Sequence, residues 1–297
     1  MVNQTRRIAL LALTTALLTG CVVSQTHALN PAPMDHAELP HPGQANLDAY
    51  TSKEIDTALG AEANDNTLAT GQRTNDVSAV FLGTPYRANM LQGANSTPER
   101  LVIDFRGLDC FTYLEYVEAL RASTSKHDFI NQLIQTRYKN GDIGFLSRRH
   151  FFSDWAGNGT LGLADDITAQ TSPDAVTVEK SLNKKADGGA YLPGLPIVKR
   201  TITYIPSKRI GKKVLSRLQT GDYIGLYTPL AGLDVTHVGF FIMTDKGPVL
   251  RHASLKKGKV VDLPFLEYVS QKPGIIVYRP KKQPGQRDAH GNVLRVG

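Results

Sequence analysis

Several familiar signals are missing from this sequence, and each absence excludes a class of protein. Cysteine occurs only at Cys21 and Cys110 among 297 residues, and there is no H-E-x-x-H pattern and no paired-cysteine metal motif. We therefore expect no metal ion and no other cofactor. No basic stripe interleaved with aromatic residues accompanies the formal charge of +7, so we also expect no nucleic-acid partner. The modest positive charge fits an anionic polymer or membrane face, or an ordinary solvated surface.

A long apolar run is also missing, and the run at the N-terminus is too short to span a bilayer. Residues 8–19 form an apolar stretch after Arg6 and Arg7, which predicts a signal peptide over residues 1–21. The stretch ends at Leu18-Thr19-Gly20-Cys21, which resembles a bacterial lipobox, where the cysteine becomes a lipidated N-terminus. We expect lipidated Cys21 to anchor the protein in the cell envelope, with the following Val22 favouring the outer membrane on its periplasmic side.

Lipidation of Cys21 would leave Cys110 without a cysteine partner, and a leftover cysteine in an exported protein suggests a reactive thiol. Cys110 lies where a loop containing Gly107 enters an amphipathic helical pattern. Free N–H groups at a helix N-terminus favour the thiolate, and they can also hold the oxyanion of a tetrahedral intermediate. The alternative for Cys110 is a buried structural cysteine.

The chain divides into four parts by composition. After the signal peptide, residues 22–74 predict a flexible tether with one helix over Ser52–Leu59, and residues 280–297 predict a loose basic tail. The folded unit is expected over residues 75–279, with helices first and strands later, which is the α+β pattern. The expected helices lie after Asn75, after Asp109 and over Asp128–Tyr138, and the expected strands are Ile197–Tyr204, Asp222–Tyr227, Val235–Met243, Val249–Ala253 and Gly274–Arg279.

Two histidines lie on neighbouring predicted strands that are joined by a turn over residues 244–247. A turn centred on Asp245 and Lys246 pairs residue 239 with residue 252, and both His237 and His252 then point to one face of the sheet. A nucleophilic cysteine needs a base and a third group that orients the base. The alternative is a pair of strand histidines without a catalytic role.

These residues belong to an ordered set of motifs: Gly83-Thr84-Pro85-Tyr86, Asp109-Cys110, Thr236-His237-Val238-Gly239 and His252-Ala253-Ser254. The set resembles, in the same order, that of NlpC-type cell-wall peptidases. Further segments narrow the resemblance: Leu82–Tyr86, Glu99–Val102, Arg106–Cys110, His150–Trp155, Tyr204–Pro206, Gly221-Asp222 and Gly232–Gly239. With them the likeness is closer to one branch, the N-acetylmuramoyl-L-alanine amidase-like proteins, and covers roughly residues 77 to 279.

The resemblance implies a papain-like fold, with the nucleophile at a helix N-terminus packed on an antiparallel sheet. It implies that Cys110 is the nucleophile, His237 the general acid and base, and His252 the group that orients His237. Four further residues are candidates for binding substrate, each with a structural alternative. They are Tyr86, Asp109, Asp154 and Trp155. The structural alternative is a half-buried packing role for Tyr86, a helix cap for Asp109 and core packing for Trp155.

The resemblance further implies hydrolysis of the amide between N-acetylmuramic acid and L-alanine, through a thioester, with peptidoglycan or muropeptide fragments as substrate. Two alternatives remain open at this point. One is an endopeptidase of the same fold that cleaves γ-D-glutamyl-diaminopimelate, and the other is a non-catalytic lipoprotein that binds cell wall.

Overall fold

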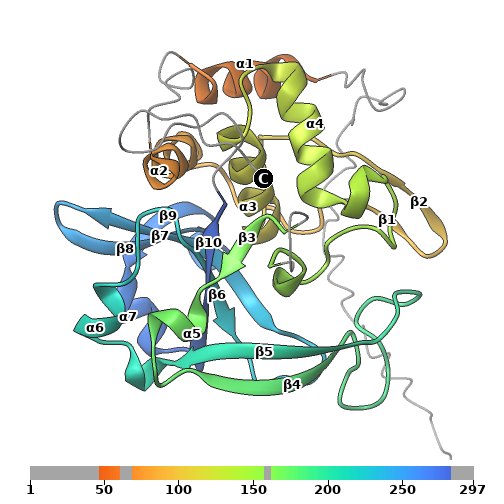
Figure 1. Cartoon of the computed structure of the whole chain (residues 1–297). Helices are drawn as coiled ribbons and strands as arrows, with labels where there is room; N and C mark the ends of the chain where they lie inside the picture. The colour runs from red at the N-terminus through yellow and green to blue at the C-terminus, as the bar shows by residue number, and fades with distance from the viewer. Residues whose placement is uncertain (1–46, 61–68, 157–161, 282–297) are drawn as a thin grey trace, which may run out of the picture. The chain divides into compact units, whose positions relative to one another are not determined.

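The computed structural model describes residues 47–60, 69–156 and 162–281 (Figure 1). All of the described residues belong to one compact unit. The predicted signal peptide, Cys21 and nearly all of the basic tail lie outside the described residues. Within the described ranges, no helix is both long enough and apolar enough to cross a membrane.

Four helices pack together on one face of the sheet (Figure 1). The central helix, α3, contacts α2, α4 and the strands β7 and β8, whereas α1 packs on α2 and α4. Polar side chains define where two of these helices begin, since Asp48 caps α1 and Ser125 caps α4 through bonds to backbone N–H groups. The bounds are α1 (Ala49–Ala58), α2 (Thr70–Val80), α3 (Cys110–Arg121) and α4 (Lys126–Arg137).

The main sheet is antiparallel, with strand order β4-β5-β10-β6-β7-β8-β9, and the short β3 pairs with β10. A separate hairpin is formed by β1 (Gln92–Ala94) and β2 (Thr97–Arg100). The strands of the main sheet are β3 (Ala164–Asp166), β4 (Val176–Leu182), β5 (Val198–Pro206), β6 (Tyr223–Tyr227), β7 (Val235–Thr244), β8 (Gly247–Ser254), β9 (Lys259–Pro264) and β10 (Gly274–Pro280).

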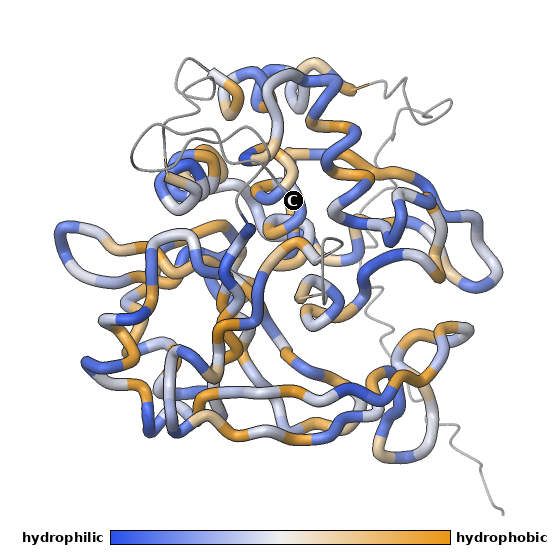
Figure 2. The backbone as a smooth tube through the Cα atoms, in the orientation of Figure 1, coloured by the Kyte–Doolittle hydropathy of each residue, from blue (hydrophilic) through white to orange (hydrophobic). Residues whose placement is uncertain are grey.

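The sheet buries apolar side chains on both faces, because successive residues of a strand point in opposite directions. On β7, Phe240 packs into the larger core beneath the helices, while Phe241 packs into a second core on the other face. Figure 2 shows apolar stretches along these strands and the inner helices. The second core is covered by three short helices, α5 (Thr168–Thr171), α6 (Lys212–Leu215) and α7 (Phe265–Ser270).

The α+β class and the antiparallel sheet predicted from sequence are confirmed, and five predicted strands correspond to β5, β6, β7, β8 and β10. The expected β7–β8 register is also confirmed, since Phe240 lies opposite Arg251 and Thr244 opposite Gly247. The other five strands, β1, β2, β3, β4 and β9, lie outside the predicted set. Ile55 of α1, which precedes the predicted start of the folded unit at residue 75, is fully buried in the larger core.

Candidate active site

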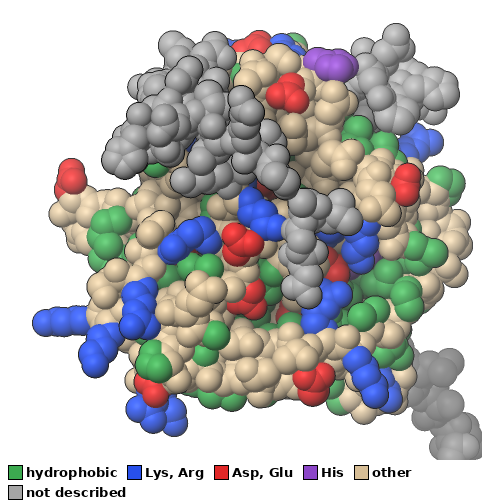
Figure 3. Space-filling model, in the orientation of Figure 1, with side chains coloured by type: hydrophobic (Ala, Val, Ile, Leu, Met, Phe, Trp, Pro, Cys, Tyr) green, Lys and Arg blue, Asp and Glu red, His purple; other side chains and the backbone are tan. Residues whose placement is uncertain are grey.

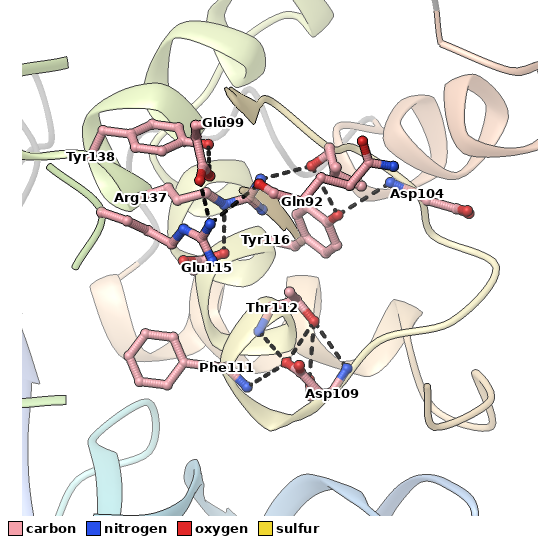
Figure 4. Close-up of polar contacts among 12 residues, drawn as sticks. Gln92, Glu99, Asp104, Asp109, Phe111, Thr112, Glu115, Tyr116, Arg137 and Tyr138 are labelled. Carbon is pink, nitrogen blue, oxygen red and sulfur yellow. Dashed lines mark hydrogen bonds and ion pairs between the residues drawn. The ribbon is translucent and has the colours of Figure 1, made fainter. Parts of the chain in front are cut away.

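Cys110 is the first residue of α3, and the preceding Asp109 caps that helix. Asp109 Oδ1 accepts hydrogen bonds from the backbone N–H groups of Phe111 (3.0 Å) and Thr112 (2.8 Å) (Figure 4). Thr112 Oγ1 in turn accepts from the backbone N–H of Asp109 at 2.9 Å, which completes a capping box. The structural alternative predicted for Asp109 is therefore present, and the box fixes the position of the cysteine backbone.

The half-buried Cys110 thiol lies between α3 and β7. Burial, reinforced by the Asp109 carboxylate, raises the pKa of the thiol to about 12, although the backbone N–H groups of Val238, Cys110 and Phe111 act to lower it. The expected preference of the helix N-terminus for thiolate is therefore outweighed, because the loss of solvation disfavours the charge more strongly. At neutral pH the resting group is the neutral thiol, so attack by sulfur requires a base.

His237 on β7 and His252 on β8 are hydrogen-bonded to each other, with His237 Nε2 2.5 Å from His252 Nδ1. Burial lowers the pKa of His237 to about 3 and that of His252 to about 4, and the Lys272 ammonium acts in the same direction on both. Both rings are therefore neutral at neutral pH. Since Nε2 of His237 is hydrogen-bonded to His252, Nδ1 of His237 is the nitrogen left to accept a proton.

The backbone explains why the two rings meet. Gly239 lies opposite His252 in the register, and a Cβ atom at Gly239 would come within 2.9 Å of the His252 Cβ and 2.8 Å of the Arg251 carbonyl oxygen. The motif glycine thus leaves the space in which His252 packs, and it lies one residue after Val238, whose N–H points at the Cys110 sulfur. The sheet therefore places the histidine pair and the backbone that contacts Cys110 on the same short stretch of β7.

Tyr86, a candidate for binding substrate, lies close to Cys110. The segment before it pairs with the residues before Cys110, because Leu108 N–H donates to the Pro85 carbonyl at 3.1 Å and Arg87 N–H donates to the Leu108 carbonyl at 3.0 Å. Burial raises the pKa of Tyr86, and Cys110 and Asp109 add to the effect. The phenol therefore retains its proton, and it lies near enough to Cys110 and Asp109 for their charges to act on it.

Asp154 and Trp155 are placed differently from the substrate-binding prediction. Trp155 is fully buried, and its ring makes edge-to-face contacts with Phe111 and Tyr223. Asp154 accepts a bond from Arg200 Nη1 at 2.9 Å and its side chain is only 5% exposed. The Trp155 ring therefore has no accessible surface, as its core-packing alternative predicts, and Asp154 forms an ion pair that holds its loop against β5.

Two residues at the site carry no sequence signal that would reveal them. The ring of Tyr268, on α7, lies 4.8 Å from the His252 ring and 6.5 Å from the His237 ring, measured between centroids. Lys272, just after α7, holds its Nζ 5.0 Å from the centroid of the Tyr268 ring. Within the described ranges, no group of three or more His, Cys, Asp or Glu side chains is arranged to hold a metal ion.

The fold and the site together define a class of α+β protein. A helical layer that holds a cysteine packs on an antiparallel sheet that holds a pair of histidines. The family model of N-acetylmuramoyl-L-alanine amidase-like proteins matches residues 76–275, and the chain belongs to this family. The resemblance predicted from the motifs is therefore confirmed. No functionally curated protein matches the sequence.

Solved structures of similar fold agree with this assignment. A crystal structure of an N-acetylmuramoyl-L-alanine amidase from Bacteroides uniformis is 30% identical, covers 72% of this chain and 99% of its own, and superposes with a TM-score of 0.62. A Legionella pneumophila protein from a family defined by a domain of unknown function is 24% identical, with coverage of 79% and 96% and a TM-score of 0.63. The second likeness concerns the fold alone.

Proposed function

We propose that this protein hydrolyses the amide between the lactyl group of N-acetylmuramic acid and L-alanine, with Cys110 as nucleophile on a papain-like fold of NlpC type. The observation that carries the proposal is the hydrogen-bonded pair His237–His252 on β7 and β8, next to the strand backbone that contacts Cys110 at the start of α3. Membership of the amidase-like family supports peptidoglycan or its muropeptide fragments as substrate.

The neutral resting state determines how the proton moves. His237 Nε2–H donates to His252 Nδ1, and His237 Nδ1 takes the Cys110 proton as sulfur attacks the carbonyl carbon. The oxyanion accepts bonds from the backbone N–H of Cys110 and from the Tyr86 phenol, because the next two N–H groups of α3 are bonded to Asp109. The C–N bond then breaks as His237 returns the proton to the leaving amine. Water, deprotonated by His237, cleaves the thioester and releases the muramic acid carboxyl group.

One observation favours a second candidate, the γ-D-glutamyl-diaminopimelate endopeptidase. All three capping bonds to the Asp109 side chain go to Oδ1, and Oδ2 takes no part in them. The Asp109 charge acts on Cys110, so this carboxylate is near enough for Oδ2 to pair with the free amine of an N-terminal L-alanine on the acyl side. The two candidates give different products from muramoyl-tripeptide, which makes that substrate the test of the proposal. A wall-binding protein without catalysis would release neither set of products.

The role of His252 leads to a graded prediction. If His252 orients His237, His252→Ala should lower kcat by about 10- to 100-fold, whereas His252→Gln should recover part of the loss by retaining a side-chain acceptor. His237→Ala should cost more than either. Steady-state kinetics on one muropeptide measures all three, and equal losses for Ala and Gln at position 252 would show that the hydrogen bond to His237 is not its contribution.

We infer that the protein is held in the cell envelope by lipid on Cys21, on the outer membrane facing the periplasm. Exposed basic residues fit an anionic envelope surface, and they gather over α6 in Figure 3: Lys208, Arg209, Lys212 and Lys213. The wild type should partition with membranes in its native host, and Cys21→Ser should remain unprocessed or become soluble. Fractionation followed by mass spectrometry of the N-terminus measures this, and an unlipidated, soluble wild type would exclude the anchor.

A further inference from the structure

Lys272 is a cation at the candidate active site, and the proposed reaction assigns it no role. It is half-buried, its Nζ contacts the Tyr268 ring, and its charge lowers the pKa of both His237 and His252. A general base becomes positively charged when it takes a proton. A fixed positive charge nearby therefore opposes the step that His237 is proposed to perform.

No carboxylate of the described residues lies within ion-pair distance of Lys272. The acid whose charge acts on His252 is Asp262, but both of its oxygens bond to Arg251, at 2.8 and 3.0 Å. The α7 side of the site therefore holds a half-buried ammonium group that lacks a counter-charge within the described chain. An anionic group on a bound substrate would supply that counter-charge and would remove the repulsion on His237.

We propose that Lys272 binds the α-carboxylate of D-glutamate, the second residue of the stem peptide. The ring of Tyr268 packs against the Lys272 ammonium group at this subsite. This inference rests on the proposed function and names the part of the substrate recognised beyond the scissile amide. When the amide between N-acetylmuramic acid and L-alanine lies at Cys110, that carboxylate follows the scissile amide by one L-alanine residue. This is a reach of about 7 Å in an extended chain. The Tyr268 ring lies between the two positions, 6.5 Å from the His237 ring and 5.0 Å from Lys272 Nζ.

The proposal couples recognition to catalysis. When the carboxylate is bound, the charge of Lys272 is compensated, and the pKa of His237 should rise toward its ordinary value. A substrate with the free carboxylate therefore binds better and meets a stronger base than a substrate in which that group is a neutral amide. The preference should appear in both the binding constant and kcat/KM, because the ion pair forms in the ground state and persists in the transition state.

The test uses two muramoyl-peptides that differ at one group, L-Ala-D-glutamic acid and L-Ala-D-isoglutamine. Wild type should prefer the acid by about tenfold in kcat/KM. Lys272→Gln should abolish the preference, and Lys272→Arg should retain most of it. Lys246→Gln is the matched control, since Lys246 is exposed in the β7–β8 turn and its loss removes the same charge. Equal treatment of the two substrates by wild type, or an unchanged preference in Lys272→Gln, would overturn the proposal.

Two measurements keep this outcome separate from that of the proposed function. The dissociation constants of both peptides with Cys110→Ala should show the same preference without any hydrolysis, and its absence overturns the subsite whatever the enzyme cleaves. NMR titration of His237 in the free protein should give a higher pKa in Lys272→Gln than in wild type. An unchanged titration would show that Lys272 does not act on the histidine pair.

Discussion

Cys110→Ala should reduce turnover of a muropeptide amide by at least about 10⁴-fold, the largest effect on activity that we expect. The thiol supplies the electron pair that forms the acyl-enzyme. His237 acts on the thiol as a base and does not replace it as a nucleophile. His237→Ala should cost nearly as much. The double variant should be little worse than either single one, because nucleophile and base act as a unit.

The same variant should leave the fold intact. Alanine keeps the helix position, the capping box of Asp109 and Thr112 uses no atom of the cysteine side chain, and the thiol is half-buried. Unfolding of wild type and Cys110→Ala by heat should therefore give similar midpoints. Retention of more than about a hundredth of wild-type turnover by a folded Cys110→Ala would show that sulfur is not the nucleophile.

The second large effect concerns stability rather than catalysis. Arg137 of α4 and Glu115 of α3 form an ion pair with side chains 0% and 1% exposed, at 2.8 Å, and Arg137 also donates to the Val102 carbonyl at 2.7 Å (Figure 4). Arg137→Met removes one partner and leaves a buried carboxylate without its cation. The free energy of unfolding should fall by about 3–5 kcal/mol, measured by urea denaturation.

An exposed pair provides the control for that measurement. Lys126 pairs with Asp56 at 2.9 Å, with side chains 35% and 63% exposed, and Lys126→Met should cost no more than about 1 kcal/mol. Adding Glu115→Gln to Arg137→Met should recover part of the loss, since the unpaired charge is then removed. Similar small losses for Arg137→Met and Lys126→Met would show that burial of the Arg137 pair does not govern its contribution.

The part of the site closest to the motifs could be predicted from sequence. The tight turn at residues 244–247 sets the register of β7 and β8, and with it the meeting of His237 and His252. Asp109 immediately before an apolar helical pattern likewise predicts the cap and the start of α3. Both features depend on residues close together in the chain, where turn and capping rules apply.

The remainder depends on partners distant in the chain. The ion pair of Asp154 with Arg200 and the burial of Trp155 against Phe111 follow from how loops and helices pack, and neither leaves a local pattern. Tyr268 reaches the histidines from α7, a helix of six residues that is too short to give a clear periodic signal. Lys272 becomes significant only when the position of its neighbours is known.

Mass spectrometry of the products from muramoyl-tripeptide tests the central claim most directly. The substrate contains both candidate bonds. One reaction therefore shows which bond is cleaved, and running it with wild type and with Cys110→Ala shows whether Cys110 is required. An amidase with Cys110 as nucleophile should release free N-acetylmuramic acid and the intact tripeptide with wild type, and neither with the variant. Release of muramoyl-dipeptide and free diaminopimelate, or of the amidase products by Cys110→Ala as well, would contradict the account.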